Sequence, residues 1–370
     1  MAVTILWFII GLLALIGGAE LLVRSASKLA GFLGIPKLII GLTVVAFGTS
    51  APELAISIQA GISGQTDIML GNIVGSNISN ILLIFGLTAL IIPLKVNANL
   101  IRIDVPVMIG VTLLMYAFAW NGFVTFWECL ALSVLLIIYM FFLFSQSRTT
   151  AVPVDLEKQK RTPAAIIIYI MIGLAGLGLL IFGSRWLVQS AVILAELAGV
   201  SELVIGLTVV AFGTSLPEVV TALVAAFKKE RDIAVGSIIG SNILNILAVL
   251  GVSGLFIPEA IPVKSALLRF DMLILIAVSF ACIPIFFTGH KISRWEGFIF
   301  LALYVSYISY LFLSAADHFV LEAFSTTMMI FVIPIIVLTI LFTAGREWII
   351  RQRYKELGKR LRKRDRNEQQ

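Results

Sequence analysis

The chain has 370 residues, of which 60% are hydrophobic and only 13% are charged, and its mean hydropathy is +1.06. Soluble domains carry about 25% charged residues, so this composition excludes an ordinary soluble protein and predicts an all-α polytopic membrane protein. The net charge is +6. Because the basic residues follow the pattern of membrane topology described below, we expect the lipid bilayer and no nucleic acid as a partner.

A membrane-spanning helix needs about 20 mostly apolar residues, and the sequence contains eleven such runs. In chain order we expect spans at 3–23, 38–61, 68–92, 103–121, 125–145, 163–187, 203–226, 233–257, 270–288, 297–314 and 325–345. No positive charge precedes the first run, so we expect a span there and not a cleaved secretory signal. Lys and Arg gather in alternate connections, and the positive-inside rule then predicts an outside N-terminus and a cytoplasmic C-terminus.

Ten consecutive residues, GLTVVAFGTS, occur twice, at 41–50 and at 206–215. Each copy is followed by one apolar residue and Pro-Glu, which puts Glu53 and Glu218 at equivalent positions 165 residues apart. The repeat continues as GSNISNIL at 75–82 and GSNILNIL at 240–247. Because each copy holds five spans, an odd number, the second copy must cross the membrane in the opposite direction. Inverted repeats are typical of secondary transporters, whose substrates bind near the midplane at broken helices.

The repeats define the expected domain organisation. We expect a first five-helix half at 1–145, a polar cytoplasmic linker at 146–162, a second inverted half at 163–314, an extra span at 315–345 and a basic cytoplasmic tail at 346–370. The tail holds ten Lys or Arg in its first 21 residues. It either anchors the topology as a solvated helix or contacts anionic lipid headgroups.

Each repeated phrase predicts a helix break deep in the membrane. Pro52 and Pro217 have no N–H and crowd the carbonyl four residues back, and broken backbone at that depth is tolerated only when it is buried in protein or lines a wet cavity. An intramembrane carboxylate such as Glu53 or Glu218 is a functional candidate by default. Freed carbonyls and nearby hydroxyls complete an oxygen set suited to hard cations; the hydroxyls belong to Thr49, Ser50, Thr214 and Ser215. Alternatively, Ser50-x-x-Glu53 and its copy are capping boxes that start each second half-helix.

The third and eighth spans supply further polar groups. Asn72, Ser76 and Asn80 recur every four residues on one helical stripe, and Ser237, Ser241 and Asn245 repeat the stripe in the second half. Neighbouring glycines allow close helix packing, but packing does not explain two asparagines in each helix. Asn80 and Asn245, and secondarily Asn77 and Asn242, are therefore candidate ligands or supports of ligands. The chain has only two Cys and two His, which disfavours zinc, haem and histidine-based catalysis.

The two copies resemble the paired α-repeats of the cation/Ca²⁺ exchanger superfamily. The first copy carries GTSAPE with GNIVGSNISNI, and the second carries GTSLPE with GSIIGSNILNI. The chain up to about residue 314 is similar to prokaryotic sodium/calcium exchangers. The resemblance implies ten core helices, no cofactor, transported Ca²⁺ and Na⁺, and location in a prokaryotic inner membrane. It implies carboxylate ligands at Glu53 and Glu218, side-chain oxygens at Thr49, Ser50, Ser76, Asn80, Thr214, Ser215, Ser241 and Asn245, and backbone carbonyls at Ala46 and Ala211. Some members have Asp where this chain has Asn245, and in the potassium-dependent branch that Asp is associated with K⁺; Asn245 argues against K⁺ dependence.

These features predict an antiporter that exchanges Ca²⁺ for Na⁺ by alternating access, in which spans one and six move against the remaining core helices. A Ca²⁺/H⁺ or Na⁺/H⁺ exchanger of the same superfamily is the alternative within transport. An intramembrane hydrolase would need a nucleophile or an oriented water, and no His, Cys or Asp pair stands at the matching depth. A channel would carry current without coupling to a counter-ion.

Overall fold

The computed structural model describes residues 1–149, 163–198, 213–316, 320–321, 326–334, 337–338 and 345. The first half begins with α1 (Ala2–Leu33). A broken helix follows, made of α2 (Lys37–Ile40), the π-helical segment η1 (Gly41–Val45), α3 (Ala46–Thr49) and α4 (Ala51–Ile62). The half continues with α5 (Thr66–Ser79), η2 (Asn80–Ile84) and α6 (Phe85–Ile91), then η3 (Leu100–Asp104) with α7 (Val105–Ala119), and finally α8 (Phe126–Thr149).

The second half repeats this order. It contains α9 (Pro163–Leu197), α12 (Leu216–Phe227), the helix made of α13 (Arg231–Leu244), η5 (Asn245–Leu250) and α14 (Gly251–Gly254), then η6 (Leu267–Asp271) with α15 (Met272–Phe287), and α16 (Arg294–Ala315). The predicted spans agree with these helices, except that α1 and α9 run about ten residues further than the apolar runs indicated. The start of the seventh span, with its copy of the repeated phrase up to residue 212, lies outside the described residues. So does most of the eleventh span, of which η7 (Met328–Val332) is described.

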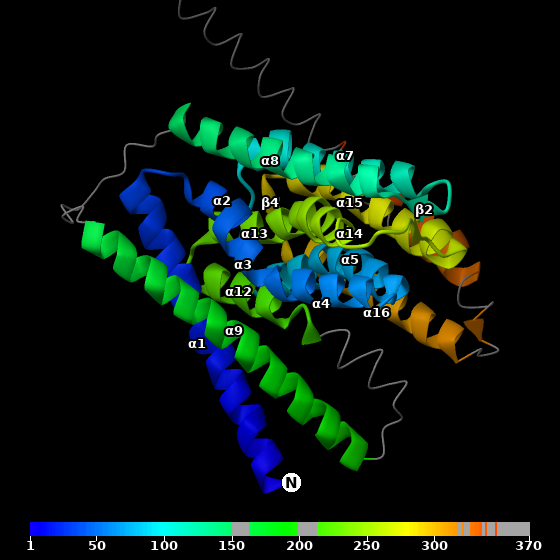
Figure 1. Cartoon of the computed structure of the whole chain (residues 1–370), viewed down its shortest axis with the longest axis horizontal. Coiled ribbons are helices and arrows are strands. Elements are labelled where there is room, and N and C mark those ends of the chain that lie inside the picture. Colours follow the sequence, from blue (N-terminus) through cyan, green and yellow to red (C-terminus); the bar gives the residue numbers. More distant parts are fainter. Residues whose placement is uncertain are drawn as a thin grey trace, which may run out of the picture.

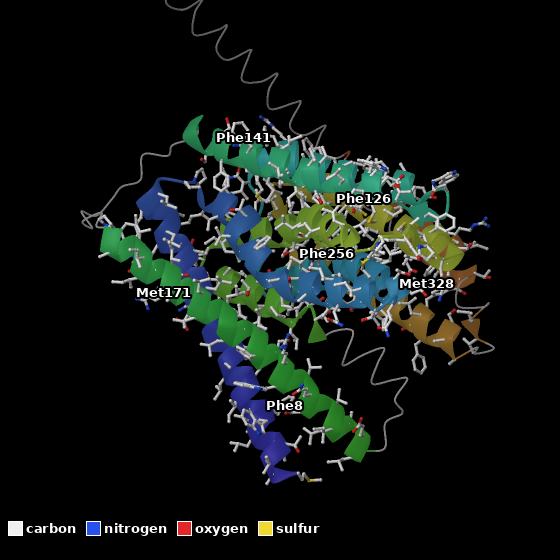
Figure 2. All side chains as sticks on the ribbon, in the orientation of Figure 1. Phe8, Phe126, Phe141, Met171, Phe256 and Met328 are labelled. Carbon is white, nitrogen blue, oxygen red and sulfur yellow. The ribbon has the colours of Figure 1, made fainter. Side chains whose placement is uncertain are left out.

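The described helices have the length and polarity of membrane spans. Eight are long and apolar enough to cross a bilayer, and the broken pair Lys37–Thr49 and Ala51–Ile62, bent by 45°, makes a ninth. Large apolar side chains point outward around the bundle (Figure 2): Phe141 is 76% exposed and Met171 is 60% exposed. Since a soluble monomer rarely exposes so much contiguous apolar surface, this belt is the surface that lipid covers. The protein is an integral membrane protein.

The two halves make equivalent contacts, so that exchanging one half for the other reproduces the same pairs of elements. The strand β1 (Leu94–Lys95) pairs antiparallel with β4 (Lys291–Ile292), and β2 (Phe123–Val124) pairs antiparallel with β3 (Ile261–Pro262). Strands β1 and β3 follow corresponding helices, and β2 and β4 precede corresponding helices, so each pairing becomes the other when the halves are exchanged. α4 and α5 likewise return as α12 and α13 after 165 residues. This recurrence is what a pseudo-two-fold axis between repeats produces.

α1 and α9 form a closely packed pair at one side of the other helices (Figure 1). Gly11 faces Gly183, and Gly18 faces Gly176, which is again the same contact with the halves exchanged. A Cβ atom at Gly18 would lie 2.6 Å from the carbonyl oxygen of Gly176. The two backbones therefore touch, as small residues allow in membrane helices, and α1 and α9 can behave as one unit.

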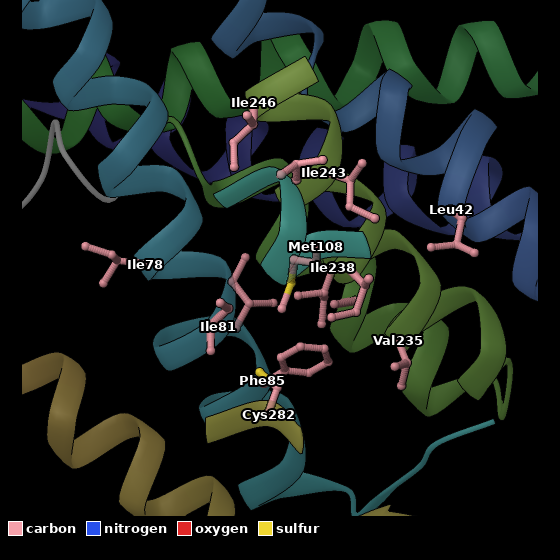
Figure 3. Close-up of a cluster of buried hydrophobic side chains, with 14 of the residues drawn as sticks. Leu42, Ile78, Ile81, Phe85, Met108, Val235, Ile238, Ile243, Ile246 and Cys282 are labelled. Atoms are coloured by element: carbon pink, nitrogen blue, oxygen red, sulfur yellow. The ribbon is translucent and has the colours of Figure 1, made fainter. Parts of the chain in front are cut away.

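The core lies around α13 and its extension through η5 and α14, a helix in which every residue from 233 to 251 is buried. Figure 3 shows Ile238, Ile243 and Ile246 of this helix among Leu42, Phe85 and other large side chains that come from several elements. Gly240 lets η1 approach closely, since a Cβ there would lie 2.6 Å from the carbonyl oxygen of Leu42. This packing fixes the polar residues of α13 beside the first broken helix.

Candidate ion-binding site

Two helices, α4 and α12, each place a carboxylate in their first turn, and α4 is the second part of the described broken helix. Pro52 and Pro217 occupy the first turn of α4 and α12, where a missing N–H costs nothing, and the residue before each helix, Ser50 or Ser215, has left helical geometry. Glu53 and Glu218 follow directly, and they are 1% and 5% exposed. The sequence therefore puts two acids inside the protein because the prolines force the chain to restart its helix there.

The two carboxylates face a common region. The Ser50 hydroxyl donates a hydrogen bond of 3.4 Å to Oε1 of Glu218, which belongs to the other half, and the Thr49 hydroxyl also lies in reach of that carboxylate. Glu218 interacts electrostatically with Glu53. Neither Ser50 nor Ser215 makes a side-chain capping bond to its own helix. The capping-box interpretation is therefore wrong for these serines, and Ser50 reaches across the repeat interface instead.

Several buried oxygens in this region have no hydrogen-bond partner. They are Oε2 of Glu53, Oε2 of Glu218, Oγ of Ser241, Oδ1 of Asn80 and Oδ1 of Asn245. A buried polar atom without a partner costs about 1 to 3 kcal/mol, and native proteins leave few such atoms. The set contains carboxylate, amide and hydroxyl oxygen without sulfur or imidazole, which is the ligand chemistry of hard cations.

The elements around the carboxylates bring the asparagines to them. α4, which carries Glu53, packs against η5, which begins at Asn245; α12, which carries Glu218, packs against η2, which begins at Asn80. Both asparagines thus stand where an α-helix widens into a π-helical segment, a feature that is frequent at functional sites. Among the described residues, no group of three or more His, Cys, Asp and Glu could hold a metal. The site combines two acids with neutral oxygens.

Most of the site residues predicted from the sequence lie in the interior of the protein. Thr49, Ser50, Ser76, Ser215 and Ser241 are buried, as are Asn80 and Asn245, and Thr214 is partly buried. The carbonyl of Ala46 accepts the Ser50 N–H at 3.0 Å and the Thr49 hydroxyl at 3.3 Å, so it is not freed as expected and would have to be shared with an ion. Ala211 lies outside the described residues.

Three supporting contacts were not predicted from the sequence. The Asn72 amide donates to the backbone carbonyl of Glu53 at 3.2 Å and to Ser57 at 3.0 Å, which ties α5 to α4. Ser184 of α9 donates to the carbonyl of Gly213 at 2.9 Å, within the second repeated phrase. The third contact links Asn77 to Asn245 at 3.0 Å. In the sequence, only the recurrence of polar residues at equivalent positions of the two halves indicated that Asn72 and Asn77 support the site.

A helical membrane protein has the architecture of a secondary transporter when its two related halves each bring a buried carboxylate at the start of a helix to one region, beside a broken helix in the first half. The chain matches the sodium/calcium exchanger protein family over residues 3–145 and 168–313, and it belongs to that family. It is similar to the sodium/calcium exchanger MaX1 of Methanosarcina acetivorans, with 34% identity over 84% of this chain and 99% of the relative. It is also similar to the inner membrane protein YrbG of Escherichia coli, with 36% identity over 74% of this chain and 86% of the relative.

Solved structures give the same result. The sodium-calcium exchanger NCX_Mj, in a structure obtained without Na⁺ and Ca²⁺, superposes with a TM-score of 0.73 at 31% identity, over 83% of this chain and 98% of that chain. A second structure of NCX_Mj, soaked with 10 mM Na⁺ and without Ca²⁺, has a TM-score of 0.72 at 32% identity. The fold of an exchanger therefore extends over both halves of this chain.

Proposed function

We propose that this protein is an antiporter that exchanges Ca²⁺ for Na⁺ across the membrane by alternating access. The observation that carries the proposal is the cluster of buried, unpartnered oxygens around two carboxylates, which lie at the starts of α4 and α12. The names of its relatives MaX1 and NCX_Mj support Na⁺ and Ca²⁺ as the ions. The proposed ligands are the twelve residues predicted from the sequence, with Glu53 and Glu218 at the centre.

The two carboxylates explain why transport would be coupled. Two buried negative charges in one region repel each other and lose their hydration, so an empty site is costly. One Ca²⁺ neutralises both carboxylates, and Na⁺ ions at the same oxygens do so as well. Because the ions use common ligands, they compete. An empty, doubly charged site would not pass readily through an occluded state, and each crossing then requires an ion.

The packing of α1 and α9 suggests what moves. These helices touch through their glycines, and they pass α3 and α12 on one side of the bundle (Figure 1). Ser184 of α9 contacts the backbone of Gly213, just before α12, so a shift of the pair would alter the surroundings of the site. We propose that α1 and α9 move together against the core. The proposed setting is a prokaryotic inner membrane, with the N-terminus outside and the basic tail at the cytoplasmic surface, where it can contact anionic lipid.

The proposal is tested by flux in proteoliposomes. An outward Na⁺ gradient should drive Ca²⁺ uptake by the unchanged protein, and Glu53→Gln or Glu218→Gln should abolish it. Asp67→Asn is the matched control, because it makes the same chemical change at an acid that is 51% exposed and paired with Lys264. Equal uptake by all variants would refute the site. Uptake driven by a pH gradient but not by Na⁺ would establish a proton-coupled exchanger instead.

A further inference from the structure

Asn77 links the two repeats next to the proposed site. It lies on α5, one turn before Asn80, and its side chain is completely buried. Its amide nitrogen donates to the backbone carbonyl of Asn242 at 3.3 Å, and its Oδ1 accepts a hydrogen bond of 3.0 Å from the amide nitrogen of Asn245. Both partners belong to the second half of the chain, so one side chain of the first half ties α5 to the end of α13 and to the start of η5.

The hydrogen bond between Asn77 and the backbone carbonyl of Asn242 determines the direction of the hydrogen bond that follows it, between Asn77 and Asn245. A backbone carbonyl can only accept, so the end of the Asn77 amide that meets Asn242 must be its NH₂ group. Oδ1 of Asn77 then faces Asn245, which must present its own NH₂ group. This leaves Oδ1 of Asn245 as the end without a partner, and that atom is indeed buried without a hydrogen bond.

We propose that Asn77 is a positioning residue that fixes the amide of Asn245, so that Oδ1 of Asn245 and not its NH₂ group is offered to the transported ion. The inference rests on the proposed function, because it assumes that Asn245 is a ligand. An amide without this support could turn its NH₂ group toward the site, and a group that only donates cannot bind a cation. Asn77 removes that orientation before the ion arrives.

The same contact selects the residue at position 245. An ionised Asp there would face Oδ1 of Asn77 with a second acceptor, and two acceptors at hydrogen-bond distance repel each other. The pair Asn77 and Asn245 thus favours a neutral ligand and keeps the central charge at the two glutamates.

The arrangement is not repeated in the other half of the site. Asn242 occupies the position equivalent to Asn77, but its NH₂ group donates to the carbonyl of Ile238 at 2.9 Å, on its own helix. Neither side-chain atom of Asn80, the residue equivalent to Asn245, has a hydrogen-bond partner. The two halves therefore offer one oriented amide and one amide without such a support, although their sequences are alike.

The test is a double-mutant cycle on Ca²⁺ affinity. Asn77→Ser removes the oriented acceptor and should raise the KM for Ca²⁺ about three- to tenfold with little change in maximal rate, the effect expected of one hydrogen bond. Asn245→Asp should weaken Ca²⁺ binding beside Asn77 but be better tolerated in the Asn77→Ser protein, whose hydroxyl can donate to a carboxylate. The matched control is Asn242→Ser, which replaces an equally buried asparagine and keeps the backbone carbonyl that orients Asn77.

Melting temperatures and equilibrium ⁴⁵Ca²⁺ binding in detergent separate folding from ligation. Where Asn77→Ser does not fold, Asn77→Ala takes its place in the cycle, since it also removes Oδ1. The proposal is overturned if the effects of the changes at 77 and 245 are additive, or if Asn242→Ser shows the same coupling to Asn245→Asp. If Glu53→Gln still binds Ca²⁺ normally, the proposed site itself fails. If Glu53→Gln abolishes binding while Asn77→Ser leaves it unchanged, only the role of Asn77 fails.

Discussion

The contact between α1 and α9 provides a sensitive test of the moving pair. Gly18→Ala would place a Cβ 2.6 Å from the carbonyl oxygen of Gly176 and 2.7 Å from the backbone nitrogen of Leu180, whereas ordinary contacts begin at 3.4 Å. Because both obstacles are backbone atoms, no side chain can give way. To restore ordinary contact the helices must separate by about 0.8 Å at the crossing, and overpacking of this kind costs about 1 to 3 kcal/mol.

Gly17 offers a control one residue away, since a Cβ at Gly17 would meet nothing within 4 Å. We expect Gly18→Ala to lower the melting temperature in detergent and to reduce Na⁺-driven Ca²⁺ uptake in proteoliposomes, while Gly17→Ala leaves both near the level of the unchanged protein. Gly11→Ala should behave like Gly18→Ala, because a Cβ at Gly11 would lie 2.8 Å from the carbonyl oxygen of Gly183. Equal stability and uptake for Gly17→Ala and Gly18→Ala would refute the close packing of α1 on α9.

Three further changes test other contacts of the protein. Gly254→Ala would drive a Cβ into the sulfur of Cys129 and should destabilise the protein by about 1 to 3 kcal/mol. Adding Cys129→Gly should restore stability, because the other half has Ala89 facing Gly297 at the equivalent contact. If thermal melts showed no rescue, the two contacts would not be equivalent between the halves. Asn72→Ala removes the bonds to the Glu53 carbonyl and to Ser57 and should both raise the KM for Ca²⁺ and lower the melting temperature, whereas Gln59→Ala, which breaks one exposed bond to Ser63, should do neither. Lys264→Ala breaks an exposed ion pair with Asp67 and should change the free energy of unfolding by less than about 1 kcal/mol in denaturant titrations; a larger loss would show that this contact supports the fold.

The duplication made much of the fold predictable. Pro52 predicted a break in the second span, and the structure bends there by 45° with Ser50 outside helical geometry. The repeated Asn and Ser stripes predicted that α5 and α13 carry polar groups into the interior, and Asn80 and Asn245 are buried as expected. These features were readable because proline chemistry and helical spacing are local properties that recur at both positions.

Other features depend on contacts that no local pattern reveals. The extension of α1 beyond residue 23 includes Arg24 and Lys28, which lower the hydropathy without ending the helix. The π-helical segments that begin at Asn80 and Asn245 have no signature of their own in the sequence. The same letters, Ser-Asn-Ile, precede both sites, yet Asn77 bonds across the repeats while Asn242 bonds within its helix. Tertiary packing, which differs between the halves, decides this difference.

Competition between the two ions at equilibrium tests the central claim most directly. The account holds that Ca²⁺ and Na⁺ use common oxygens around Glu53 and Glu218, so ⁴⁵Ca²⁺ bound to purified protein should be displaced by Na⁺, and the Glu53→Gln, Glu218→Gln double variant should bind neither ion. The control protein Asp67→Asn should retain both binding and displacement. Ca²⁺ binding that survives saturating Na⁺, or that persists without the two carboxylates, would contradict the account.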